Sequence, residues 1–236
     1  MGYRNEAITE PWEEMTISII DNKNNVNTLG DEAAFSSNGL IKIRGASSRN
    51  FEKKQYGIKL LDEQSLESEV SLLGMEADED WVLSNSILDS SYIRNYMAYN
   101  IGGQVFPYTP EARFCEVVIH NDGKYQYYGL YLLLENIKKA EGRVNIADFN
   151  PYENRLSYIV CRDRKHEGKL TLSTWASDSQ LCQGYFTFSY PKEELLTSEV
   201  ISRVEDDIST IEKILYSDNA ARNRSFYYYN LLEIIR

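Results

Sequence analysis

The chain has 236 residues, of which 42% are apolar, and this length is enough to bury a sizeable core in one large domain or in two lobes. Its formal net charge of −11 argues against tracking along DNA or RNA, because that function needs a broad basic face that releases counterions from many phosphates. No run of 18 apolar residues occurs, so no transmembrane helix is predicted.

The first predicted elements flank a basic segment in this acidic chain. Residues 41–44 and 55–61 alternate apolar and polar side chains with period two, which predicts two strands, and GASSRN is typical of the turn between them. Between its first and last cations the segment holds a single acid, Glu52. The six cations are Lys42, Arg44, Arg49, Lys53, Lys54 and Lys59. This cluster predicts a small, highly charged anion as a ligand.

Lys59 is the strongest candidate for contact with that anion. In the strand 55–61 it alternates with three apolar residues, so these can pack inward while the ammonium group faces a cleft. Arg44 and Arg49 are expected to form forked hydrogen bonds with the oxygens of the anion, and Lys54 is a further candidate. Taken singly, each of these side chains could equally be a solvated surface cation.

An acidic, loop-like segment over residues 62–80 precedes a predicted helix over residues 90–102. Asp89 is its predicted N-cap, and two glycines follow its last turn. The apolar side chains predicted to share one face of the helix are Ile93, Tyr96, Met97 and Ile101. Arg94 is expected to form a structural ion pair with Asp80 or Asp89.

A hairpin is predicted next, with strands over residues 112–120 and 126–135 around the turn signal Asn-Asp-Gly. Its second strand is apolar enough to be buried on both faces. We expect a mostly antiparallel sheet in which one strand of this hairpin pairs with the strand that carries Lys59. Glu116 or Glu135 could then reach the Lys59 ammonium from the hairpin.

A second region begins near residue 140. Short strands are predicted at LSYIVCR and GYFTFSY. From Ser198 to Leu215, apolar residues recur at helical spacing, which predicts an amphipathic helix that packs on an apolar surface. The polar face of this helix is predicted to carry Glu205, Asp206, Glu212 and Lys213.

The C-terminal segment SFYYYNLLEIIR, with a possible helix cap at Ser225, still presents apolar residues at its last positions. It is expected to belong to a domain that continues beyond Arg236. Its exposed apolar side chains predict concentration-dependent self-association.

The positions of cysteine and histidine predict no metal site. Cys115, Cys161 and Cys182 share no CxxC spacing, and only His120 and His166 could join them. Buried or incidental thiols are therefore expected.

Three motifs follow one another between about residues 40 and 165. They are RGASSRNFEKKQYGIKL, LGMEADEDWVLSNSILDSSYIRNYMAYNIG and ARFCEVVIHNDGKYQYYGLYLLLENIKKAEGRVNI. Together and in this order they resemble the CotH family, the spore-coat-H-type atypical protein kinases. The chain departs from the family where Ala46 stands in place of a usual asparagine and Asn136 in place of a usual lysine.

The resemblance implies an α+β, atypical protein-kinase-like fold with an N-lobe over residues 1–139 and the start of a helical C-lobe over residues 140–236. It implies that ATP is bound with a divalent metal, Mg²⁺, and that its terminal phosphate is transferred to Ser or Thr hydroxyls of a protein substrate. The order of strand, helix, hairpin and exit segment is also that of a kinase small lobe. This order requires a hairpin strand to pair with the Lys59 strand.

On this resemblance, Lys59 is expected to be the catalytic lysine that holds the phosphates. The residues expected to bind nucleotide are Arg44, Arg49, Lys54, Lys59 and Glu135. Glu135 marks the exit segment whose backbone would meet adenine. No metal ligand is assigned, because the family's metal-binding aspartates are expected beyond Arg236. Residues 1–236 are therefore expected to bind nucleotide weakly and to transfer no phosphate.

A non-catalytic role is the alternative. The 18 tyrosines and three tryptophans could form an adhesive or carbohydrate-stacking face, and CotH-like domains also occur in surface proteins. A pseudokinase scaffold of the spore coat is a third interpretation. The resemblance implies a spore-coat, secreted or cell-surface location, and ATP binding would separate the kinase from an adhesin.

Overall fold

The computed structural model describes residues 11–22, 26–45, 47–163, 168–181 and 184–216. The chain divides into two compact units, Met1–Ile137 and Lys138–Arg236. No helix among the described residues is both long enough and apolar enough to cross a bilayer.

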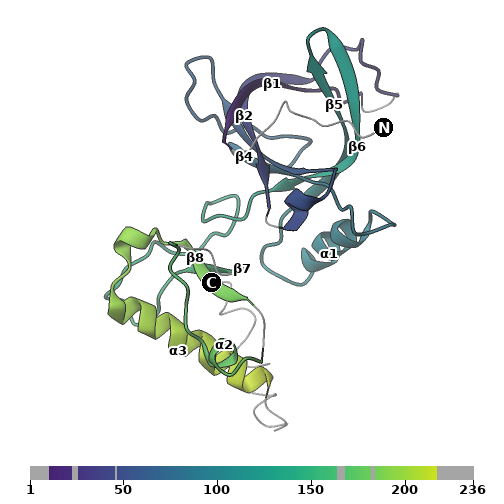
Figure 1. Cartoon of the computed structure of the whole chain (residues 1–236). Helices are drawn as coiled ribbons and strands as arrows, with labels where there is room; N and C mark the ends of the chain where they lie inside the picture. Colours follow the sequence, from purple (N-terminus) through teal and green to yellow (C-terminus); the bar gives the residue numbers. More distant parts are fainter. Residues whose placement is uncertain (1–10, 23–25, 46, 164–167, 182–183, 217–236) are drawn as a thin grey trace. The chain divides into compact units, whose positions relative to one another are not determined.

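The first unit is built on a six-stranded antiparallel sheet in the order β1-β2-β3-β4-β6-β5. Its strands are β1 (Glu13–Ile19), β2 (Phe35–Arg44), β3 (Gln55–Leu61), β4 (Asp80–Ser84), β5 (Ala112–Asn121) and β6 (Lys124–Glu135). The sheet curls strongly, so that one of its faces lies inside the curl (Figure 1). The α+β class and the four predicted strands are confirmed.

The inner face of the sheet carries the core of this unit. Tyr56, Ile58 and Leu60 of β3 are buried there, as the alternation in the sequence predicted. Trp81 of β4 and Leu133 of β6 pack with them. Apolar residues of the loop between β3 and β4 complete the core and hold this segment, which has no regular secondary structure, against the sheet.

The strand order corrects one expectation. β4 lies between β3 and β6, so neither strand of the β5–β6 hairpin pairs with the strand that carries Lys59. β4 escaped prediction because it is only five residues long and follows an acidic loop. It is buried on both faces, and such strands show no alternation of apolar and polar residues.

Helix α1 (Arg94–Gly102) begins four residues later than predicted. Its N-cap is Ile93, and Asp89 instead accepts hydrogen bonds from the backbone N–H groups of Ser91 (3.0 Å) and Arg94 (2.8 Å) in the preceding turn. The Arg94 guanidinium also lies 3.5 Å from the Asp89 carboxylate. The predicted structural ion pair of Arg94 is therefore confirmed.

The apolar face predicted for α1 is confirmed at Tyr96 only. Ile93, Met97 and Ile101 are 44%, 48% and 56% exposed. Tyr96 and Tyr99 are the side chains that pack on the sheet. The packed face therefore includes one residue of the predicted set, Tyr96, together with Tyr99, which the prediction left out.

The hairpin of β5 and β6 turns at Asp122 and Gly123, which both have positive φ (49° and 73°), as an Asn-Asp-Gly signal predicts. β6 is buried from Tyr131 to Glu135, but its first four residues are exposed. The prediction of a fully buried second strand is therefore confirmed only for its final part.

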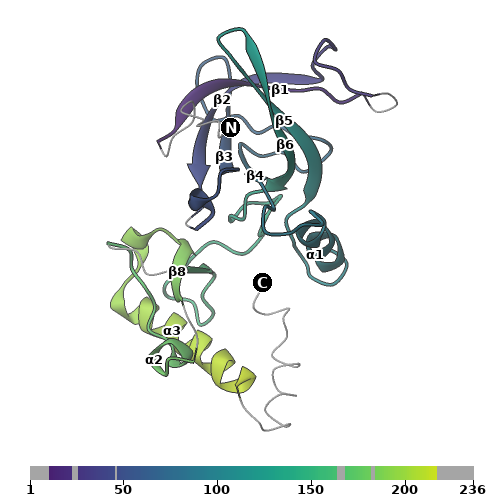
Figure 2. The ribbon, with the colours of Figure 1, turned by 45° about the vertical axis from the view of Figure 1, so that its right-hand side comes forward.

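The second unit contains a two-stranded sheet of β7 (Ile159–Asp163) and β8 (Tyr185–Tyr190), with helices α2 (Trp175–Asp178) and α3 (Ser198–Leu215). Both predicted strands and the long helix are confirmed, and α2 lies against α3 (Figure 2). α3 buries Val204 and Ile208 against Leu172 and apolar residues of the sheet. The segment that begins at Ser225 lies outside the described residues.

Glu212 corrects the predicted polar face of α3. Its side chain is buried rather than solvated. The carboxylate accepts hydrogen bonds from Thr174 Oγ1 (3.0 Å) and from the backbone N–H of Ala176 (2.8 Å). Glu212 therefore joins α3 to the first turn of α2 and satisfies a backbone donor that would otherwise be unpaired.

Candidate functional site

A hollow of about 370 Å³ lies on the outer face of the sheet in the first unit. This volume is within the range of small-molecule sites, roughly 300–1,000 Å³. Cations dominate its polar lining. The lining side chains that bear on its chemistry are those of Trp12, Lys42, Arg44, Arg49, Asp80 and Asn136, with Gly57 between them.

Gly57 makes room for the hollow. It lies opposite Lys42 of β2 and Val82 of β4, at the centre of three paired strands. A Cβ atom at this position would lie 3.5 Å from the Trp12 ring and 3.8 Å from the side chain of Lys42, which are ordinary contact distances. The missing side chain therefore leaves an open floor between a tryptophan and a lysine.

The turn after β2 forms one end of the hollow. Gly45 has a φ of +93°, and a Cβ atom there would lie 2.0 Å from Ser48 Oγ, so the turn requires glycine. The 3₁₀ helix η1 (Ser47–Asn50) follows, and Lys54 Nζ donates a hydrogen bond of 2.6 Å to the carbonyl oxygen of Arg49. Lys54 thus holds the backbone of the turn that presents Arg49.

Two of the lining cations have no acidic partner within the described part of the chain. No carboxylate there forms an ion pair with Arg44, and burial lowers the pKa of its guanidinium. No carboxylate in these residues forms an ion pair with Lys42 either, and its Nζ lies 4.3 Å from the centre of the Trp12 ring. Partly buried cations without counter-charges favour the binding of an anion.

Lys59 has a different environment. Its Nζ lies 2.5 Å from Glu67 Oε1 and 3.5 Å from Asp80 Oδ1, and it is not among the lining residues. Burial opposes its charge, but the hydrogen bond that it donates to Glu67 and the charge of Asp80 outweigh burial and raise its pKa. The acids that hold Lys59 are therefore these two rather than Glu116 or Glu135.

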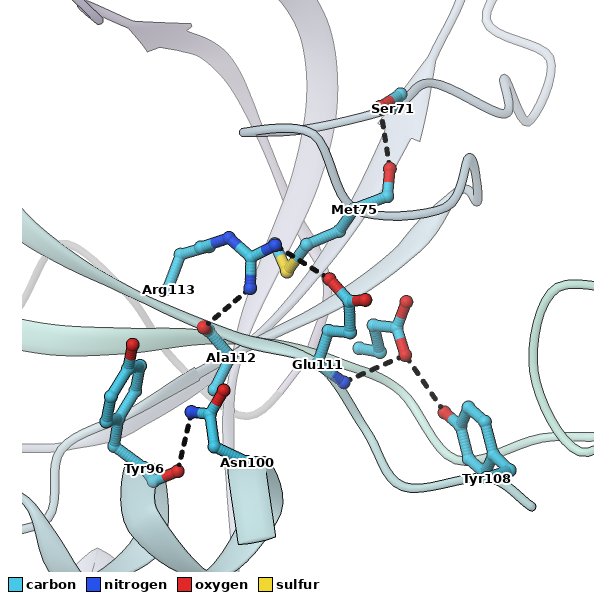
Figure 3. A network of polar contacts seen from close by, with 9 residues as sticks. Ser71, Met75, Tyr96, Asn100, Tyr108, Glu111, Ala112 and Arg113 are labelled. Carbon is cyan, nitrogen blue, oxygen red and sulfur yellow. Dashed lines mark hydrogen bonds and ion pairs between the residues drawn. The ribbon is translucent and has the colours of Figure 1, made fainter. Parts of the chain in front are cut away.

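Glu135 also faces away from the hollow. Its buried carboxylate accepts hydrogen bonds from the backbone N–H of Glu111 (3.0 Å) and from the Tyr108 hydroxyl (3.3 Å) on the inner side of the sheet. Figure 3 shows Tyr108 and Glu111 in this network. The next residue, Asn136, does line the hollow. The exit segment therefore reaches the hollow one residue after the position that the sequence suggested.

Lys53, the remaining cation of the cluster between β2 and β3, is structural. Its Nζ lies 4.4 Å from the centre of the Tyr131 ring and 5.1 Å from that of Tyr92, and it donates a hydrogen bond to the carbonyl oxygen of Leu130. Burial lowers the pKa of this ammonium group. Lys53 thus ties the β2–β3 connection to β6.

One group of carboxylates in the described segments is close enough to hold a metal ion. The side chains of Asp78, Glu79 and Asp80 each offer an oxygen atom, and these atoms lie within 4.8 Å of one another. However, Asp78 already accepts the backbone N–H of Asp80 at 2.7 Å, and Asp80 is paired with Lys59. Only Asp80 lines the hollow, so the group does not offer a divalent ion several free carboxylates beside a bound anion.

The structure thus brings together part of the predicted set. Arg44 and Arg49 line the hollow, while Lys54 supports the turn behind them, and the side chains of Lys59 and Glu135 lie elsewhere. Lys42 belongs to the predicted cluster of six cations but was not among the residues expected to bind nucleotide, and Trp12 and Asp80 were not predicted for this site. Lys42 could have been found, because it alternates with the same two isoleucines as Arg44 and so shares its face of the strand.

A family model described as CotH kinase protein matches residues 41–221. The chain belongs to the CotH family. The matched region starts within β2 and includes every lining residue of the hollow except Trp12. No curated protein matches this CotH chain.

Proposed function

We propose that this CotH chain binds ATP in the hollow on the outer face of its sheet. The observation that carries the proposal is the presence of Lys42, Arg44 and Arg49 around a single small hollow in an otherwise acidic protein. A triphosphate brings about four negative charges, and its recognition depends mainly on such neutralisation. Trp12 offers an aromatic surface at the same place.

The family supports a further step. We propose that the full-length protein is an ATP-dependent protein kinase of the CotH type that transfers the terminal phosphate to protein Ser or Thr hydroxyls, with Mg²⁺ as cofactor. Mg²⁺ would supply neutralisation of phosphate charge, but the carboxylates of the described residues do not form a set that fits it. A kinase-like, two-lobed fold is proposed on the family description alone. The strand order counts against it, because β4 separates β3 from the hairpin and the pairing required of a kinase small lobe is not present in the described sheet.

Binding of ATP to residues 1–236 tests the first step. Isothermal titration calorimetry is expected to show saturable binding that weakens as salt is raised, because the contacts are between charges. Arg44→Met is expected to weaken binding. Arg113→Met serves as the matched control, because Arg113 is paired with Glu111 and is not among the lining residues of the hollow. The absence of ATP binding would refute the proposal.

Phosphate transfer tests the second step. The full-length protein, incubated with Mg²⁺ and γ-labelled ATP, is expected to label a protein substrate or itself. ATP binding without any labelling would favour a pseudokinase over a kinase. By its family, the protein is proposed to act at the spore coat or the cell surface.

A non-catalytic binding module is the second candidate. The observation in its favour is the exposed aromatic surface of the β5–β6 hairpin, where Tyr125 and Tyr127 are 60% and 61% exposed and the His120 ring stacks on Tyr125 at 4.4 Å. Exposed aromatic rings of this kind stack on sugars or on partner proteins. Loss of glycan or protein binding in Tyr125→Ala, with no ATP binding in the parent, would support this candidate instead.

A further inference from the structure

Lys42 and Lys59 lie on the same face of the sheet, on neighbouring strands. Lys42 is opposite Gly57 in the register of β2 and β3, and Lys59 lies two residues further along β3, opposite Asp80 of β4. Residues two apart in a strand point to the same face, so either ammonium group could reach the hollow. The groups that each ammonium contacts decide which of the two lysines is available to a ligand in the hollow.

The Lys59 ammonium is engaged by two carboxylates, Glu67 at 2.5 Å and Asp80 at 3.5 Å. Contact with a phosphate would exchange these charge-assisted hydrogen bonds for others of the same kind and would withdraw the Lys59 charge from both carboxylates. The exchange therefore brings little gain. Lys59 is held at the side of the hollow by these contacts.

The Lys42 ammonium lines the hollow and contacts the face of the Trp12 ring. No carboxylate in the described ranges pairs with it or with Arg44, its neighbour but one along β2. A cation over an aromatic face keeps its charge available to an anion. Lys42 and Arg44 can therefore contact phosphate oxygens without breaking an ion pair.

Asp80 explains why Lys59 nevertheless matters. It is the acid among the described lining residues, and an unneutralised carboxylate at this position would repel a polyphosphate. Lys59 lies directly opposite Asp80 and offsets its charge. Lys59 therefore favours an anion in the hollow indirectly, by reducing the repulsion between that anion and Asp80.

We infer that Lys42, together with Arg44, contacts the phosphate oxygens of a polyphosphate ligand, and that Lys59 is a positioning residue that neutralises Asp80 at the edge of the hollow. The inference rests on the proposed function to the extent that the polyphosphate is that of ATP. It gives Lys42 the role for which the sequence suggested Lys59.

A set of single and double variants separates direct from indirect contact. The affinities for ATP and for inorganic tripolyphosphate are measured by calorimetry for the parent, Lys42→Met, Lys59→Met and Asp80→Asn, and for each lysine variant combined with Asp80→Asn. Lys42→Gln provides a second, polar replacement, and circular dichroism shows that each variant is folded. Double variants are needed because neighbouring charges do not act additively.

Lys42→Met is expected to weaken binding at least tenfold, whether or not Asp80 carries its charge. Lys59→Met is expected to weaken binding only while Asp80 is charged, so the Lys59→Met/Asp80→Asn protein should bind within twofold of Asp80→Asn alone. A tenfold loss in that double variant, or unchanged binding in Lys42→Met and Lys42→Gln, would overturn the inference.

The two probes distinguish this inference from the proposed function. If tripolyphosphate binds with the expected pattern and ATP does not, the roles of Lys42 and Lys59 stand and ATP binding is refuted. If ATP binds but depends on Lys59 rather than Lys42, the proposed function stands and the inference fails. If neither probe binds the parent protein, both fail.

Discussion

We expect the Arg44 side chain to lower the free energy of unfolding when the hollow holds no anion. Its guanidinium is partly buried, and no carboxylate within the described residues pairs with it. Methionine keeps an unbranched apolar stem but carries no charge. We therefore expect Arg44→Met to leave the free energy of unfolding unchanged or to raise it, because the cost of burying an unpaired charge is removed.

The same substitution should remove most of the stabilisation that a ligand provides. At a free ligand concentration 100 times the Kd, binding raises the free energy of unfolding by about 2.7 kcal/mol. Loss of charge-assisted hydrogen bonds worth roughly 1.5–3 kcal/mol raises the Kd about 10- to 150-fold. At the same ligand concentration the variant would then be stabilised by only about 0.3–1.4 kcal/mol.

Chemical denaturation with and without ATP measures both effects. Arg113→Met is the control, because it makes the same change at a guanidinium that is paired with Glu111 at 2.8 Å and lies outside the lining of the hollow. A loss of stability without ligand that is larger for Arg44→Met than for the control would refute the argument about unpaired charge. Undiminished stabilisation by ATP in Arg44→Met would refute its role in binding.

Three other predictions concern the fold and the reactivity of its thiols. Glu212→Ala is expected to lower the free energy of unfolding by about 3 kcal/mol, since it removes two hydrogen bonds to a buried carboxylate, and urea denaturation would measure this. Gly45→Ala is expected to cost about 1–3 kcal/mol, because its φ is +93°, and to weaken ATP binding in calorimetry. Burial raises the pKa of Cys115 to about 11 from 9.0. At pH 8 the Cys115 thiol of the folded protein should therefore react with a disulfide reagent roughly 100-fold more slowly than the same thiol in the unfolded protein. The rates are measured in a protein with Cys161→Ser and Cys182→Ser. The folded thiol keeps its proton where the unfolded thiol loses it, so the contribution of Cys115 to stability should fall as the pH rises from about 9 to 11. Equal reaction rates in the two states, or full stability in either of the other variants, would contradict the corresponding argument.

The sequence predicted those elements whose pattern is local. The alternation in β2 and β3, the turn signal before Lys124 and the helical spacing of α3 each correspond to an observed element. β4 was missed because burial on both faces removes alternation. The packed face of α1 was predicted at Tyr96 but not at Tyr99, and the three aliphatic residues predicted with Tyr96 are exposed.

The candidate site could be predicted only in part for a related reason. The charge of the basic segment is visible in the sequence, and it led to Arg44 and Arg49. The partner of each cation is not visible, because Glu67 reaches Lys59 across a loop and Trp12 reaches Lys42 from the start of another strand. Ion pairs and ring contacts of this kind depend on the tertiary fold and carry no periodic signal.

Labelling with an acyl phosphate of ATP tests the central claim most directly. This reagent transfers its acyl group to a lysine amine beside the terminal phosphate, with ATP as the leaving group, and peptide mass spectrometry identifies the labelled lysine. We predict that Lys42 is labelled and that excess ATP prevents this labelling, because the hollow holds the phosphates beside its ammonium group. ATP-protected labelling of Lys59 without Lys42, or labelling of Lys42 that excess ATP does not prevent, would contradict the account.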